Sequence, residues 1–169
     1  MIYTSNYNYC NTKQYIPCSI SGNKGKDANF NGKYYPLLAP KLKFWKIFHN
    51  NIGKINDMEN YKFYIREYYN QVLSNLDPLE TYNELDNNIL MCYENNNEFC
   101  HRHIVAAWFE LFLNIHIPEI IINNEIIEVS RPSYIKEYLE LYIKQALNTD
   151  SIKEYYLNNT NNKVKKLVN

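Results

Sequence analysis

The sequence predicts an α/β fold in which a mainly parallel sheet is flanked by helices. The central observation is an apolar run, Ile89–Tyr93, that ends in Glu94 and is followed within ten residues by a helical pattern. In that pattern apolar residues recur with the spacing of one helix face, at 104, 105, 108, 111, 112 and 115. A buried strand that leads directly into a helix is the unit from which such sheets are built. The chain of 169 residues is long enough for one such domain.

Two shorter strands are expected before this element. The first begins at residues 2–4 and passes into the polar Ser5 and Asn6, and the second covers residues 15–21, with Pro17 at its beginning or on an edge. A strand that ends in hydroxyl and amide side chains is typical of a ligand-facing loop, and a plain polar turn is the alternative. The glycines at residues 22–26 lack the spacing of a phosphate-binding motif. That basic loop either holds an anion or is a solvated turn.

Three helices are expected between these strands and the central one. Residues 41–48 form a short amphipathic helix after Pro40, and residues 60–76 place their apolar side chains on one face. Asp77-Pro78-Leu79-Glu80 is a helix N-terminus, with an acceptor at the cap, proline at the first position and glutamate at the third. This third helix is expected to run through residue 85.

The segment after the central helix adds both strand and helix. Residues 120–122 and 125–129 flank an Asn-Asn turn, and one or both are expected to be strands. Pro132-Ser133 begins a further helix, and Ser151-Ile152-Lys153-Glu154 is a capping box for a last one. We therefore expect an α/β core over residues 1–129 and C-terminal helices packed on it over residues 130–157. Residues 158–169 are rich in asparagine and lysine and are expected to be disordered.

The composition excludes several classes of protein. Eighteen basic and eighteen acidic residues give a formal net charge of zero, so no overall field attracts nucleic acid or an anionic membrane. No leader-like or membrane-spanning run is visible, and we expect a cytoplasmic protein. Its four cysteines are then expected to be reduced rather than paired in disulfides. The composition leaves the oligomeric state open.

The junction between the central strand and its helix is the predicted site, because ligands of open α/β sheets bind beyond the carboxyl ends of the strands. A thiol at a helix start, beside His101 and Arg102, is expected to have a lowered pKa, which makes Cys100 a candidate nucleophile. Glu94 is a candidate acid or base on the opposite side of the crevice. Arg102 either binds a carboxylate or phosphate of the ligand or forms an internal salt bridge with Glu94. For Cys100 the alternative is simple packing against the sheet.

A metal site is not expected at this junction, although Cys92, Cys100, His101 and His103 lie close in sequence. Structural zinc sites use shorter loops between their cysteines, and a strand followed by a helix start does not readily aim four groups at one point. Cys92 is expected to belong to the core. Helical spacing would make Cys100 and His103 the facing pair, with His101 and Arg102 pointing elsewhere.

Five blocks of sequence, in order, resemble one known family. They are Tyr3-Thr4-Ser5, Ile16-Pro17-x-Ser19-Ile20-Ser21, Leu38-Ala39-Pro40, Leu73-Ser74-x-Leu76-Asp77-Pro78, and Leu90-x-Cys92-Tyr93-Glu94-x5-Cys100-His101-Arg102-His103. This combination resembles the bacterial and phage family called domain of unknown function 488, over about residues 2 to 129. The resemblance implies a single Rossmann-like domain but no settled activity. It marks seven positions without assigning them roles, namely Ser5, Ser19, Cys92, Glu94, Cys100, His101 and Arg102.

These observations lead to a functional hypothesis. The crevice is expected to bind a nucleotide- or nucleoside-like anionic small molecule and to hydrolyse or transfer at its glycosidic or phosphoester bond. Carboxylate-driven chemistry at an N-glycosidic bond is favoured by analogy of fold alone. The alternatives are a non-catalytic protein that binds a nucleotide signal, such as a phage or host regulator, and a cysteine-based thiol or redox protein. No cofactor is called for. The candidate catalytic residues are Glu94 and Cys100, and the candidate ligand-binding residues are Tyr3, Ser5, Ser19, Ser21, His101 and Arg102.

Overall fold

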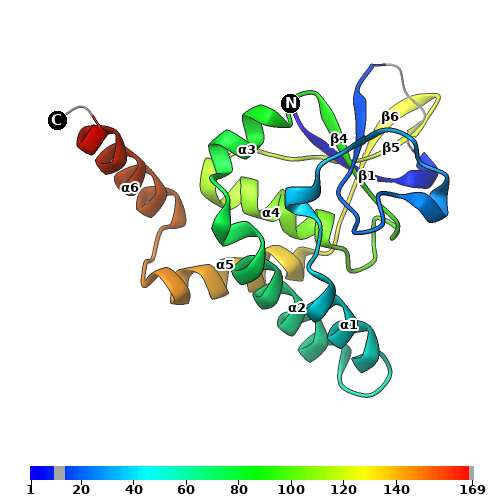
Figure 1. Cartoon of the computed structure of the whole chain (residues 1–169), viewed down its shortest axis with the longest axis horizontal. Helices are drawn as coiled ribbons and strands as arrows, with labels where there is room; N and C mark the ends of the chain where they lie inside the picture. The colour runs from blue at the N-terminus through cyan, green and yellow to red at the C-terminus, as the bar shows by residue number, and fades with distance from the viewer. Residues whose placement is uncertain (10–13, 168–169) are drawn as a thin grey trace.

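A computed structural model of the chain describes residues 1–9 and 14–167 (Figure 1). In this described part six strands form one sheet in the order β3-β2-β4-β1-β5-β6. Every neighbouring pair is parallel except β5 and β6, which form an antiparallel hairpin. The predicted α/β class with a mainly parallel, Rossmann-like sheet is therefore confirmed. The strands are β1 (Tyr3–Asn6), β2 (Ile16–Ser19), β3 (Lys33–Tyr34), β4 (Asn88–Cys92), β5 (Glu119–Asn123) and β6 (Glu125–Val129).

The register of β4 places the predicted junction at the middle of the sheet. β4 lies between β1 and β2, with Cys92 opposite Asn6 and Met91 opposite Ser19. All five residues of β4 are buried, as expected for a strand that is covered on both faces. Because the three strands are parallel, their carboxyl ends meet at one edge of the sheet. The side chains that follow β1, β2 and β4 therefore lie close to one another.

The helices α3 and α6 begin where the capping signals in the sequence indicate. The Asp77 side chain accepts hydrogen bonds from the backbone N–H groups of Leu79 and Glu80, as the predicted cap requires. Ser151 accepts one from the N–H of Glu154, which forms half of the predicted capping box. The helices are α1 (Leu42–Asn51), α2 (Asp57–Gln71), α3 (Pro78–Glu84), α4 (His101–Leu113), α5 (Ser133–Leu147) and α6 (Ile152–Leu167).

α4 is the central helix of the fold and is buried nearly all round. Its residues from His101 to Glu110 are all buried, and Trp108 and Phe109 are among the largest side chains that are fully enclosed. A helix that is apolar on every side must be covered on every side. The covering is provided by the sheet together with α2, α3, α5 and α6 (Figure 1).

The two faces of the sheet carry cores of very different size. Leu90 and Cys18 point into the large core that contains the buried residues of the helices. The alternate residues Ile89 and Met91 point to the other face, where they meet Ile120 and a layer of partly buried aromatic side chains. This alternation follows from the two-residue period of a strand. The helices are consequently gathered on one face of the sheet, and the opposite face is covered mainly by Tyr3, Tyr7, Tyr15, Phe30 and Ile122.

The C-terminal helices contribute to the same large core. Ile135, Leu139 and Ile143 of α5 and Ile152 of α6 are buried there. At the start of α5, Lys136 Nζ donates to Glu110 of α4 at 3.0 Å, and Arg131 also pairs with Glu110. α6 carries the helix beyond residue 158, where the sequence predicts disorder.

Other details differ from the sequence expectations in small ways. The short strand β3 was not expected, and the helix expected over residues 60–76 instead runs from Asp57 to Gln71 and is followed by a 3-10 turn at Leu73–Asn75. Of the cysteines that the structure describes, Cys18, Cys92 and Cys100 are free thiols. The fourth cysteine, at position 10, lies outside the described residues. No helix in the described part of the chain has the length and apolarity needed to cross a membrane.

The buried position of Leu90 leads to a prediction about stability. Leu90→Ala should lower the free energy of unfolding by about 2–5 kcal/mol, because it leaves a cavity under the middle of the sheet. Leu141→Ala is a matched control, since Leu141 is 55% exposed and should cost less than about 0.5 kcal/mol. Urea denaturation followed by circular dichroism measures both. Equal midpoints for the two variants would contradict the central position of β4.

Candidate active site

A pocket of about 600 Å³ opens at the edge where β2 and β4 end and α4 begins. This volume is in the range of small-molecule sites in proteins. One side is formed by the loop after β2, and the other by α1, α2 and the loop between β4 and α4. The lining residues are Ser21, Gly22, Asn23, Asp27, Pro40, Leu42, Trp45, Phe48, His49, Tyr64, Cys92, Tyr93, Glu94, Phe99, Cys100 and His101.

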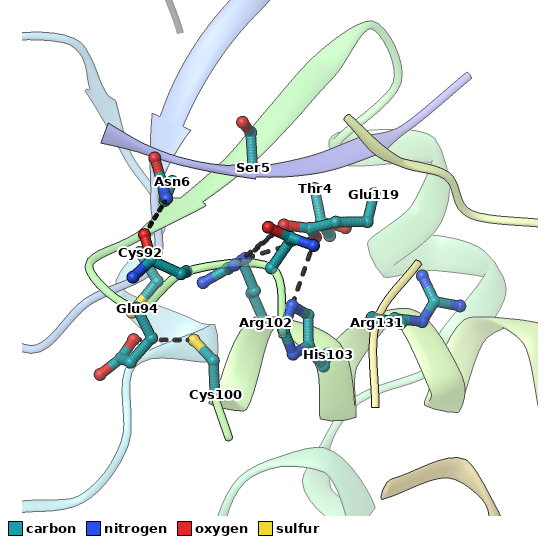
Figure 2. Close-up of polar contacts among 12 residues, drawn as sticks. Thr4, Ser5, Asn6, Cys92, Glu94, Cys100, Arg102, His103, Glu119 and Arg131 are labelled. Carbon is teal, nitrogen blue, oxygen red and sulfur yellow. Dashed lines mark hydrogen bonds and ion pairs between the residues drawn. The ribbon is translucent and has the colours of Figure 1, made fainter. Parts of the chain in front are cut away.

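The two predicted catalytic residues, Glu94 and Cys100, are in contact at this pocket. The Cys100 thiol donates a hydrogen bond to Glu94 Oε2 with an S···O distance of 2.9 Å (Figure 2). Cys100 is the N-cap of α4 and has an extended backbone, with φ −148° and ψ 145°. Glu94 lies in the loop that follows β4. The strand and the helix therefore bring a carboxyl group and a thiol together from opposite sides of one turn.

Burial and charge set the protonation of this pair. Burial, together with the nearby charge of Cys100, raises the pKa of Glu94 to about 7. Burial alone would also raise the pKa of the Cys100 thiol. However, its hydrogen bond with Cys92 and the positive charges of Arg102 and His101 outweigh burial and hold this pKa well below the usual range. A carboxyl group with a pKa near neutrality, beside a thiol that ionises readily, is suited to moving a proton.

His101 and Cys92 form the inner end of the site. His101 Nδ1 lies 3.6 Å from Cys92 Sγ, and His101 Nε2 lies 3.0 Å from the carbonyl oxygen of Ile20. Burial raises the pKa of Cys92 well above its ordinary value. Burial alone would lower the pKa of His101, but its contact with Cys100 and the charge of Glu94 raise it.

The donor atoms of Cys92, Cys100 and His101 all lie within 4.8 Å of one another, so these residues could hold a metal ion. The sequence expectation was that the four groups would not meet at one point; three of them do meet here, whereas His103 lies beside Glu119. The expected pairing of Cys100 with His103 is wrong. Because Cys100 caps the helix in an extended conformation, the i, i+3 rule for helical residues does not apply to it.

Arg102 and His103 turn away from the pocket toward β5. Arg102 is fully buried, and its Nε and Nη2 donate to Glu119 Oε1 at 3.1 and 2.8 Å. His103 Nε2 lies 3.4 Å from Glu119 Oε2. This distance is within the range of an ion pair, but the two groups do not form a hydrogen bond. Figure 2 shows this group on one side of the α4 start, with Cys100 and Glu94 on the other. Arg102 therefore forms an internal salt bridge with Glu119 rather than with Glu94, and it does not line the pocket.

The other predicted ligand-binding residues are divided between the pocket and the interior. Ser21 lines the pocket. Ser19 lies beneath it, where its hydroxyl and that of Ser21 bond to the Tyr7 hydroxyl at 2.7 and 2.9 Å. Ser5 donates to the carbonyl oxygen of Ile120 at 2.7 Å, and the Tyr3 hydroxyl is paired with Tyr15 on the far face of the sheet. Only Ser21 and His101 of the six border the cavity, and ligand binding by the six stays a prediction.

Sequence reasoning missed the aromatic side of the pocket. Trp45 and Phe48 of α1 were expected to pack in an amphipathic helix, and Tyr64 and Phe99 were assigned no role. The available signal was an excess of apolar residues in α1, where Phe44 alone is buried in the core. Phe48 is half-buried against the core, Trp45 is exposed, and both side chains line the pocket. Asn23 lies in the loop at residues 22–26 that the sequence offered as a possible anion site, but neither it nor Asp27 was given an individual role, because loop geometry is not encoded in a periodic pattern.

The fold and the pocket define a small Rossmann-like α/β protein with a thiol–carboxyl pair at the carboxyl edge of its sheet. The chain belongs to the DUF488 family, because residues 9–111 match the family model DUF488-N3a, which is described as the active DUF488-N3 subclade. The matched segment contains every residue of the cysteine, histidine and glutamate group. No curated protein and no solved structure gives a significant match to this chain.

The buried ion pair leads to a second prediction about stability. Arg102→Met should lower the free energy of unfolding by about 3–5 kcal/mol, because it leaves the carboxylate of Glu119 buried without its main partner. The double variant Arg102→Met/Glu119→Gln removes the charge as well and should be more stable than the single variant. Urea denaturation at neutral pH measures the difference. A double variant that is less stable than the single one would contradict the pairing.

The raised pKa of Glu94 leads to a prediction about pH dependence. The carboxyl group ionises near its ordinary pKa in the unfolded chain but only near pH 7 in the folded protein. Its contribution to stability is therefore fully present below the unfolded pKa and is lost as the pH rises through about 7. The Glu94→Gln variant has no carboxyl group at this position, so it does not lose stability in this way as the pH rises. In buffer containing EDTA, the melting temperature of the variant relative to the wild type should be higher at about pH 8 than at about pH 5.5. A difference that does not change with pH would contradict the raised pKa.

Proposed function

We propose that the protein binds a nucleoside-like small molecule in the pocket and hydrolyses its glycosidic bond, with Glu94 as the proton-transfer group. The observation that carries this proposal is the contact between Glu94 and Cys100 at a cavity that aromatic side chains also line. A carboxyl group that can exchange a proton and a surface that can hold a planar ring are the two requirements of such a reaction.

The aromatic side supports a ligand with a flat ring. Phe48, Tyr64 and Phe99 pack against one another with ring centroids 4.9 to 5.4 Å apart, so their orientation is set before any ligand enters. The ring centroids of Trp45 and His49 lie 4.0 Å apart with the rings tilted by 42°, and Trp45 is 40% exposed. An exposed tryptophan at the mouth of a cavity offers its face to a ring at little cost, since base–aromatic stacking contributes about 1–3 kcal/mol.

The polar side supports recognition of hydroxyl groups or base edges. Asn23 Oδ1 accepts from the Tyr93 hydroxyl at 2.7 Å, and Asn23 Nδ2 donates to Asp27 at 2.7 Å. Ser21 adds a hydroxyl group at the same side. These groups hold one another in place and still border the cavity. A ligand that carries several hydroxyl groups, such as a sugar, matches this set of donors and acceptors.

The charges of the pocket favour a glycosidic over a phosphoester bond. Among the described residues that line the cavity there is no lysine or arginine, and Arg102 is committed to Glu119. A phosphate group would therefore lack the lysine or arginine that usually binds it. In contrast, cleavage of a glycosidic bond develops positive charge on the sugar, which acidic groups stabilise. Glu94 and Asp27 are acidic residues of the lining.

The chemical step needs one water molecule and one proton, which moves from the water to the leaving group. The oxygen of water bonds to the anomeric carbon while the bond from that carbon to the ring nitrogen breaks. Glu94 takes a proton from the water and passes that proton to the departing nitrogen, so charge is balanced and Glu94 returns to its starting state. The sequence also allowed a protein that binds the ligand without converting it. That alternative differs from the proposed hydrolase only in that this chemical step does not occur.

The test is turnover of a panel of purine and pyrimidine nucleosides, with release of the free base measured by liquid chromatography. Glu94→Gln should lower kcat by at least about 100-fold while calorimetry shows nearly unchanged affinity for the same nucleoside. Glu137→Gln, which changes an exposed glutamate of α5, is the matched control and should retain full turnover. Unchanged turnover in Glu94→Gln, or recovery of every nucleoside intact from the wild type, would overturn the proposal.

A further inference from the structure

Three potential metal ligands converge at the inner end of the pocket. Cys92 is the last residue of β4, Cys100 is the N-cap of α4, and His101 is the first residue of that helix. All three side chains are buried, and all three border the cavity. Their donor atoms lie within 4.8 Å of one another, although seven residues separate the two cysteines in sequence. The fold therefore assembles a two-cysteine, one-histidine group that sequence spacing does not suggest.

The distance between Cys92 and His101 matches that between two ligands of tetrahedral zinc. Zn–S bonds of about 2.3 Å and Zn–N bonds of about 2.0–2.1 Å place neighbouring ligand atoms roughly 3.5–3.8 Å apart. Cys92 Sγ and His101 Nδ1 are 3.6 Å apart. Thiolate and imidazole donors together favour zinc over magnesium or calcium, which prefer oxygen ligands.

The surroundings of His101 prepare its Nδ1 atom for a metal. The carbonyl oxygen of Ile20 lies 3.0 Å from His101 Nε2 and can only accept a hydrogen bond, so Nε2 carries the hydrogen. In the neutral ring the lone pair is then on Nδ1, which is the nitrogen nearer to Cys92. Histidine ligands of metals are commonly held by a backbone carbonyl in this way. This contact is an observation independent of the clustering.

The charge of the site is also compatible with a divalent cation. Two thiolates and one doubly charged ion sum to zero, so the buried group would carry no net charge. The neighbouring Arg102 is neutralised by Glu119. A neutral cluster avoids the large cost of burying a net charge in a protein interior.

From these observations we infer that Cys92, Cys100 and His101 bind a zinc ion whose fourth position faces the pocket, beside Glu94. Three protein ligands with one open position are typical of catalytic rather than structural zinc. A water molecule at that position would be acidified by the ion and could pass its proton to Glu94, while its oxygen attacks the ligand. This catalytic role rests on the hydrolysis proposed above, whereas the binding of zinc does not.

The first test measures metal directly. The full chain, without a histidine tag, should purify with about one zinc ion per chain by inductively coupled plasma mass spectrometry. Cys92→Ser and Cys100→Ser should bind zinc at least about tenfold more weakly. Cys18→Ser is the matched control and should keep the ion, because Cys18 is a buried free cysteine that does not belong to the cluster. Equal zinc affinity in all four proteins would overturn the inference.

A second test does not depend on the folding of the variants. Wild-type protein that has been treated with a chelator is titrated with Co²⁺, which should produce the visible bands of a tetrahedral site and the near-ultraviolet bands of thiolate-to-cobalt charge transfer. Zn²⁺ should abolish these bands by displacement. Failure of the wild type to bind either ion would overturn the inference.

A third measurement separates this inference from the proposed function. Glu94→Gln should keep the ion while it loses turnover, and loss of the ion in that variant would overturn the open fourth position. A wild type that binds zinc but leaves the N-glycosidic bond of every nucleoside intact, for example one that releases ammonia without free base, would overturn the proposed function alone. Full turnover in protein from which a chelator has removed the zinc would overturn the catalytic role of the ion alone.

Discussion

The first turn of α4 imposes the constraint on which the rest of the structure depends. His101, Arg102 and His103 are three consecutive polar residues, and all are buried at the start of a helix that is itself enclosed by the core. Buried polar groups need partners, since each unpaired one costs about 1–3 kcal/mol. Successive residues of a helix point about 100° apart, so one partner cannot serve all three. His101 therefore turns to the Ile20 carbonyl, and Arg102 and His103 turn to Glu119.

Because these side chains point in different directions, the permanently charged Arg102 is kept apart from the reactive groups of the pocket. The guanidinium of Arg102 is held on the β5 side, where it ties α4 to the strand that follows it. The thiols, the imidazole and the Glu94 carboxyl are held on the pocket side. Arg102 still acts on the site at a distance, because its positive charge lowers the pKa of Cys100. The proposed chemistry thus uses groups with adjustable protonation, in a cavity that a fixed cation does not enter.

Local signals predicted most of the elements. Asp77 caps α3 and Ser151 caps α6 because cap geometry depends only on the few residues around a helix start. The contact between Glu94 and Cys100 could also be predicted from the sequence, because the end of a strand and the start of the next helix are close together in a parallel sheet. The ion pair between Arg102 and Glu119 could not be predicted, because Glu119 lies seventeen residues further along the chain and becomes adjacent to Arg102 only when β5 pairs with β1. The aromatic side of the pocket was missed for the same reason: α1 and the loop at Phe99 meet only in the folded chain.

By itself the sequence determined the α/β class, most of the helices and strands, the family and the strand–helix junction at which the candidate site lies. These depend on periodicity, on caps and on short motifs, which are properties of neighbouring residues. Only the tertiary structure decided that Cys92, Cys100 and His101 share one point, that Arg102 faces β5, and that tyrosine, tryptophan and phenylalanine side chains complete a cavity. The physical reason is that a side chain's direction at the start of a buried helix follows from the partners available around it. Those partners come from segments far apart in the chain.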